Sequence, residues 1–73
     1  MNLVPNIVGS KLKFIDPING AIKKTAELPT NANYSGPIVS GNLVTVGIHY
    51  NNGTNKSRTY NIISGNLVRE VSM

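Results

Sequence analysis

Residues 35–73 read SGPIVSGNLVTVGIHYNNGTNKSRTYNIISGNLVREVSM, and this stretch decides the fold. The pentapeptide SGNLV occurs in it twice, at residues 40–44 and 64–68. In both copies a Ser-Gly-Asn turn precedes an apolar segment, and glycine and asparagine accept the positive φ of tight hairpin turns. The segments between the turns alternate in polarity, which is the period of a strand with one buried face. The pattern predicts a four-stranded antiparallel meander over residues 38–73.

Residues 1–28 add further strands to this meander. The apolar run at residues 3–8 contains Pro5, which cannot donate to a ladder, so the run predicts an edge strand. The segment KLKFI at residues 11–15 alternates cleanly, with its leucine and phenylalanine on one face and its two lysines on the other. The chain is therefore expected to be all-β, with six to seven short strands in a single small domain.

Two segments between these strands are harder to interpret. Residues 21–28, AIKKTAEL, fit either a strand or a two-turn helix, and the hairpin signal Asn19-Gly20 directly before them favours the strand. Residues 29–37, PTNANYSGP, have no periodicity and predict a linker between the N-terminal strands and the meander.

Length and composition limit what this domain can do. A chain of 73 residues buries only about 60% of its unfolded surface, which leaves a marginal core. With no cysteine, one histidine and three acidic residues, neither a metal site nor another cofactor is expected. The missing stability is most simply supplied by oligomerisation. No apolar segment is long enough for a signal peptide or a membrane span, so neither is expected; the location stays unassigned, with a virion and the cytoplasm as the alternatives.

Two parts of the chain also match each other. KLKFIDPINGAIKKTAEL (11–28) aligns with SRTYNIISGNLVREVSM (57–73) when one residue is omitted from the first turn, and Phe14 then matches Tyr60. The strand, Asp-Pro-x-Asn-Gly turn and strand of the first segment resemble the outer hairpin of a PQQ-type β-propeller blade. GPIVSGNLVTVG (36–47) is similar to the inner hairpin of such a blade.

The resemblance implies a propeller-blade-like sheet, with one full blade and three strands of another. A closed propeller needs several blades, so it also implies sheets that are completed between chains. Lys24 and Arg69 stand where the blades of that family carry a closing tryptophan. No cofactor-binding residues of the quinoproteins are present, so their catalysis is not implied.

His49 is the only side chain suited to acid–base chemistry near neutral pH. It has no acidic neighbour in the sequence, and Ser57 or Thr59 is expected opposite it. No glycine-rich segment fits a phosphate-binding loop. The sequence therefore predicts no catalytic residues and a protein that is not an enzyme.

The remaining interpretation is a non-enzymatic structural or interaction protein, a subunit of a homo-oligomer or larger assembly such as a phage virion or tail. A carbohydrate-binding lectin of the propeller type is the first alternative, with Tyr50, Asn51 and Asn52 in its binding loop. A nucleic-acid-binding small β-barrel is the second, with Lys11 and Lys13 on its surface. The net charge of +4 supports that second alternative, but the basic residues are scattered and form no run.

Overall fold

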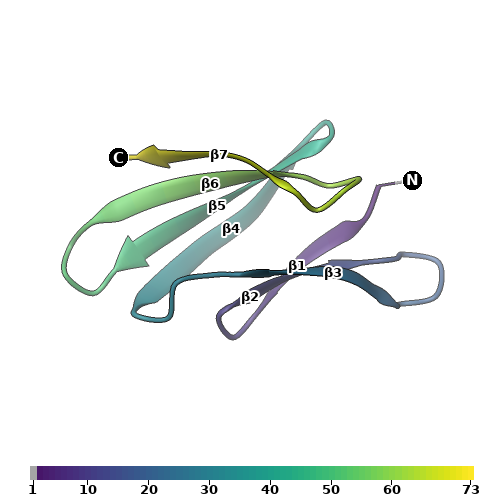
Figure 1. Ribbon diagram of the computed structural model, residues 1–73, viewed down its shortest axis with the longest axis horizontal. Helices are drawn as coiled ribbons and strands as arrows, with labels where there is room; N and C mark the ends of the chain where they lie inside the picture. Colours follow the sequence, from purple (N-terminus) through teal and green to yellow (C-terminus); the bar gives the residue numbers. More distant parts are fainter. Residues whose placement is uncertain (1) are drawn as a thin grey trace.

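The computed structural model describes residues 2–73, and these residues form seven strands and no helix. The strands are β1 (Val4–Val8), β2 (Lys11–Ile15), β3 (Ile22–Glu27), β4 (Ala32–Ser40), β5 (Leu43–Tyr50), β6 (Asn55–Asn61) and β7 (Leu67–Ser72). They pair as two antiparallel meanders, a sheet β1-β2-β3 and a sheet β4-β5-β6-β7. Figure 1 shows the four-stranded sheet stacked above the three-stranded one. The all-β prediction is confirmed, with the single expected meander divided into two.

The two sheets share one hydrophobic core. β2 contributes Leu12 and Phe14, and β5 contributes Val44, Val46 and Ile48, all of them fully buried. These residues lie at alternate positions, so each strand turns one apolar face inward. The expected face of β2 is confirmed. β6 adds Tyr60, whose ring centroid lies 6.0 Å from that of Phe14 across the gap between the sheets.

The predicted linker at residues 29–37 is mostly strand. β4 begins at Ala32 and pairs with β5 on both sides of an unpaired Gly36-Pro37, so the four-stranded meander starts before residue 38. The register shifts between Ser35 and Ile38, where Gly36 adopts a φ of +96°. This bulge interrupts the alternation of side chains, which is why the segment has no visible period. Residues 22–27, in contrast, form the strand that was favoured over a helix.

The hairpins β2–β3 and β6–β7 have the same backbone construction. In the first turn the Asp16 N–H donates to Ala21 C=O, and the Gly20 N–H donates back to Asp16 C=O. The second turn has the same two bonds, from Asn61 N–H to Asn66 C=O and from Gly65 N–H to Asn61 C=O. The side chains of Asp16 and Asn61 each accept the N–H two residues further on. Both hairpins also shift register directly before these turns, between Phe14 and Ile15 in one and between Thr59 and Tyr60 in the other.

The two hairpins nevertheless bury opposite faces. Thr59 holds the backbone position that Phe14 holds, and Tyr60 holds that of Ile15. Phe14 enters the core in the first hairpin, whereas Tyr60 does so in the second. The expected omission of a residue from the first turn is therefore wrong, because the turns are equal in length and the apolar pattern has moved by one position. A one-residue move exchanges the faces of a strand.

Gly65 lies where β3 meets the turn of the second hairpin. The stem of Lys24 packs against it, and the Lys24 Nζ donates to Asn66 Oδ1 at 2.5 Å. A Cβ on Gly65 would lie 2.8 Å from Lys24 Cδ, whereas a Cβ on Gly53 would have no neighbour within 4 Å. Both glycines have positive φ, 77° and 90°.

We therefore expect Gly65→Val to destabilise the fold more than Gly53→Val. Each variant pays about 1–2 kcal/mol for a left-handed backbone. Gly65→Val must also displace the exposed Lys24 side chain and its hydrogen bond to Asn66, which costs about 0.5–1.5 kcal/mol more. Urea denaturation of the two variants measures the difference. Gly41→Val is a further control, because Gly41 is the same position in the other SGNLV copy and has a φ of 60° with no neighbour within 4 Å. Equal midpoints would show that the Lys24 contact contributes nothing.

Candidate functional site

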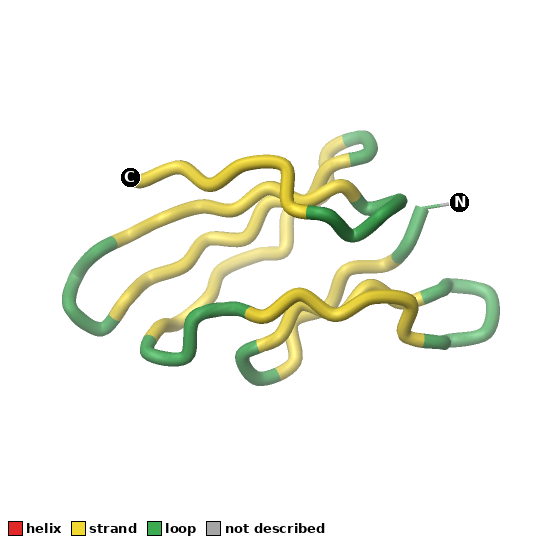
Figure 2. Tube along the Cα trace, in the orientation of Figure 1, coloured by secondary structure: helices red, strands yellow, loops and turns green. Residues whose placement is uncertain are grey.

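Three of the predicted interaction residues come together in one open groove. Tyr50 ends β5, and Asn51 and Asn52 begin the β5–β6 turn. They line the groove with residues 29–31 of the connection between β3 and β4. Figure 2 shows this connection and the β5–β6 turn at the same end of the molecule. Asn51 N–H donates to Asn31 C=O at 3.0 Å, which ties the two loops together.

The groove combines an aromatic ring with neutral polar groups. The Nζ of Lys56 lies 5.9 Å from the centroid of the Tyr50 ring. The Tyr34 hydroxyl donates to Pro29 C=O and so anchors the other wall. Asn52 uses its Oδ1 to accept the Thr54 N–H at 3.0 Å, which shapes the turn. Amides beside an aromatic ring suit a ligand that has both hydroxyl groups and an apolar face.

Lys11 and Lys13 are not part of this groove. Both lie on the outer face of the three-stranded sheet, opposite the face that bears Leu12 and Phe14. The Lys11 Nζ is 3.4 Å from Glu27 Oε2, and Lys13 pairs across the sheet with Asn6 and Thr25. The five candidate residues therefore form two separate surfaces, one neutral and one weakly basic.

A second charged cluster lies on β6 and β7. The Nε of Arg58 donates to Glu70 Oε2 at 2.5 Å, and Lys56 Nζ is 3.6 Å from Glu70 Oε1. Arg58 also donates from Nη1 to the Glu27 C=O at 3.3 Å, so the cluster joins the two sheets. The hydrogen bond from Arg58, and then the charges of Arg58 and Lys56, hold the pKa of Glu70 below its ordinary value.

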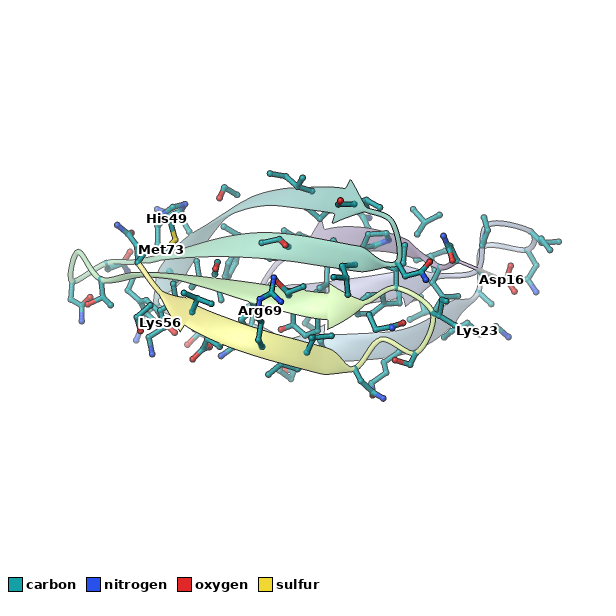
Figure 3. The ribbon with its side chains drawn as sticks, turned by 90° about the horizontal axis from the view of Figure 1, so that it is seen from above. Asp16, Lys23, His49, Lys56, Arg69 and Met73 are labelled. Atoms are coloured by element: carbon teal, nitrogen blue, oxygen red, sulfur yellow. The ribbon has the colours of Figure 1, made fainter. Side chains whose placement is uncertain are left out.

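His49 has partners that reasoning from the sequence missed. Its Nε2 lies 3.1 Å from Ser35 Oγ, and its Nδ1 lies 3.0 Å from Asn55 Oδ1. Figure 3, which looks onto the outer face of the four-stranded sheet, shows His49 toward one end and Asp16 at the other. Ser35 was overlooked because its segment was expected to be a linker. Ser57, one of the two residues expected opposite His49, instead lies across from Gly47.

Other kinds of site find no support in residues 2–73. No cluster of three or more histidine, cysteine or acidic side chains that could hold a metal ion occurs there. That part of the chain also has no helix long and apolar enough to cross a membrane.

Comparison with family models, with curated proteins and with solved structures finds no match for this chain. The resemblance to propeller blades therefore stays a prediction.

The Arg58–Glu70 contact makes stability depend on pH. A carboxylate whose folded pKa is lowered contributes stability above its unfolded pKa, and the protein loses that contribution as the pH falls through the folded value. We expect the parent protein to lose stability progressively below pH 4.5, the ordinary pKa of Glu70. Glu70→Gln should be less stable at neutral pH and should lose less on acidification. Urea denaturation at neutral and acidic pH compares the two, with Glu27→Gln as a control for the more exposed Lys11 pair. An identical pH dependence in parent and Glu70→Gln would contradict the assignment.

Proposed function

We propose that this chain is a structural or interaction subunit that joins another copy of itself through strand β7. The observation that supports the proposal is the edge position of β7, where every residue is exposed. Its exposed side chains include three large apolar ones, Leu67, Val68 and Val71. An exposed apolar edge strand offers unpaired backbone N–H and C=O groups to another strand.

The other three edge strands carry features that discourage such pairing. β1 contains Pro5 and β4 contains Pro37, and neither proline can donate to a new ladder. β3 carries adjacent lysines at residues 23 and 24. Prolines and lysines are common means of protecting a sheet edge. β7 has neither; it does carry Arg69 and Glu70, but Glu70 is paired with Arg58 and Lys56 of its own sheet, so β7 is the edge best suited to extend the sheet.

A second copy of the chain fits this edge. In a two-fold antiparallel pairing centred on Val71, Arg69 faces Met73 and Glu70 faces Ser72. Valine then meets valine at the axis, and no like charges stand opposite each other. The dimer would contain a continuous eight-stranded sheet and cover Val71 and Met73, which the single chain leaves exposed, whereas Leu67 and Val68 lie outside the paired residues. Completion of a sheet between chains also agrees with the propeller-blade resemblance.

The small size and charge-poor surface of the chain suit a component of a larger particle. A phage virion or tail is the most concrete setting for such a subunit, and size and composition support it rather than any residue.

Nucleic-acid binding is less favoured, because Lys11 is paired with Glu27 and no aromatic side chain neighbours Lys13 across its ladder.

The groove supports a second candidate function, the binding of neutral carbohydrate. Its lining of one tyrosine, three asparagines, one threonine and one proline offers amide and hydroxyl groups around an aromatic ring. None of the six lining residues is charged, which favours a neutral glycan, although the Lys56 Nζ lies 5.9 Å from the centroid of the Tyr50 ring.

The assembly proposal is tested by native mass measurement at micromolar concentration. We expect a dimer or larger species for the parent and a monomer for Val71→Lys, because a lysine on β7 opposes edge pairing. Val4→Lys is the matched control, since Val4 and Val71 are both 46% exposed and lie on different edge strands. A parent that is monomeric, with unfolding independent of concentration, would refute the proposal.

The groove is tested by probing the parent protein on an array of neutral glycans. If it binds carbohydrate, Asn51→Ala should weaken binding at least several-fold, because Asn51 lines the groove. Asn42→Ala is the control, since Asn42 is an exposed turn asparagine outside the groove. Binding that is absent, or that both variants lose equally, would remove this candidate.

A further inference from the structure

The outer face of the four-stranded sheet carries a chain of hydrogen bonds from a serine through a histidine to an amide. Ser35 lies on β4, His49 on β5 and Asn55 on β6, so three neighbouring strands supply one group each. The two distances are 3.1 Å from Ser35 Oγ to His49 Nε2 and 3.0 Å from His49 Nδ1 to Asn55 Oδ1. The register places Asn55 directly across from His49.

The chemistry of the amide decides where the protons are. An amide oxygen can only accept a hydrogen bond, so the imidazole must donate its Nδ1–H to Asn55 Oδ1. In the neutral ring Nε2 is then unprotonated, and it accepts the hydroxyl proton of Ser35. A hydroxyl that donates to an imidazole nitrogen, with the ring held by a third group, is the arrangement that activates a nucleophile.

Gly47 and the bulge of β4 make room for this arrangement. A Cβ on Gly47 would lie 2.2 Å from Ser35 Oγ and 3.4 Å from His49 Nε2, so a side chain there would displace the hydroxyl. Directly after Ser35, Gly36 and Pro37 have no paired residue on β5. The N–H of the residue after a nucleophilic serine is a common donor to the developing oxyanion.

We propose that Ser35 is a nucleophile that accepts acyl groups from small activated esters, with His49 as its general base and Asn55 as the residue that positions His49. The proposed oxyanion donor is the Gly36 N–H, chosen because it directly follows Ser35 at a position with no paired residue on β5. Ser35 is exposed on an open sheet, so the substrate class is small acyl esters with good leaving groups. This chemistry is independent of the proposed assembly through β7.

The reaction proceeds in two balanced stages. Ser35 Oγ attacks the carbonyl carbon while its proton passes to His49 Nε2, and the bond to the alkoxide or phenolate breaks as that group takes the proton. Ser35 then holds the acyl group as an ester. Water attacks this ester with its proton accepted by Nε2, and Nε2 passes that proton to Ser35 Oγ as the acyl–oxygen bond breaks, so the products are the carboxylic acid and free Ser35. One ester and one water give one acid and one alcohol.

The test combines hydrolysis of 4-nitrophenyl acetate with labelling by a fluorophosphonate reagent, the labelled residue being located by peptide mass spectrometry. We expect label on Ser35 and a loss of both reactions in Ser35→Ala. His49→Gln keeps a hydrogen-bonding side chain but removes the base, and it should slow both reactions by roughly 10²–10⁴-fold. Asn55→Asp should remain reactive, because a carboxylate also accepts the Nδ1 proton.

Ser57→Ala is the matched control, since Ser57 lies across from Gly47 on the same face and has no histidine partner. It should react at the rate of the parent. Label spread over several serines, or a His49→Gln protein that is folded and reacts like the parent, would overturn the proposal. Native mass measurement of His49→Gln separates the proposed acyl chemistry from the proposed assembly through β7. The variant should lose reactivity but keep the oligomeric state of the parent.

Discussion

The packing of β2 against β5 and β6 is the interaction on which the rest of the molecule depends. Each sheet alone is a meander with one apolar face, and such a face is stable in water only when another covers it. The contact between Phe14 and Tyr60 joins the two sheets. Among residues 2–73, nine buried apolar side chains make up this core, so the loss of any one removes a large share of it. Backbone hydrogen bonds between the sheets are few, and one is from Leu3 N–H to Ile62 C=O.

The same strands that build the core present a different surface on their other side. Along β5, Val46 and Ile48 face the three-stranded sheet, while Thr45 and His49 face outward. The outward groups satisfy each other across the strands, as when Thr45 Oγ1 meets Thr59 Oγ1 at 3.2 Å. This division lets the outer face carry chemistry or contacts without loss of core packing. It also explains a glycine in mid-strand, because Gly47 leaves room for a neighbour's hydroxyl.

The sequence predicts those parts of the structure that local pattern controls. The faces of β2 and β5 follow from clean alternation, and the Asn-Gly turn before β3 favours the strand that is found there. The groove residues 50–52 could be anticipated because an asparagine-rich loop follows a tyrosine at the end of a strand. The opposite wall, residues 29–31, could not, since only the folded chain brings it near.

Three features escaped the sequence for physical reasons. The bulge at Gly36 hides the period of β4, and with it the partner of His49. The division into two sheets depends on how the core closes, which no short segment specifies. The sequence does not show that the two hairpins bury opposite faces, because the same backbone turn allows the apolar residues to lie on either face of the strands. An alignment that matches residue types, such as Phe14 with Tyr60, then needs a one-residue gap in the first turn, although the two backbone turns are equal in length.

The division into two meanders has a consequence for how the chain folds. Every pairing within a sheet joins strands that are consecutive in the sequence, so each ladder grows from its own turn with little loop-closure entropy. Distant segments meet only when the sheets dock. The strand pairs of each meander can therefore form early, whereas neither sheet is stable until the two dock, so docking is the step that completes the fold. Until that step, each layer exposes an apolar face, and this unprotected interval is when the chain is most open to association with its neighbours.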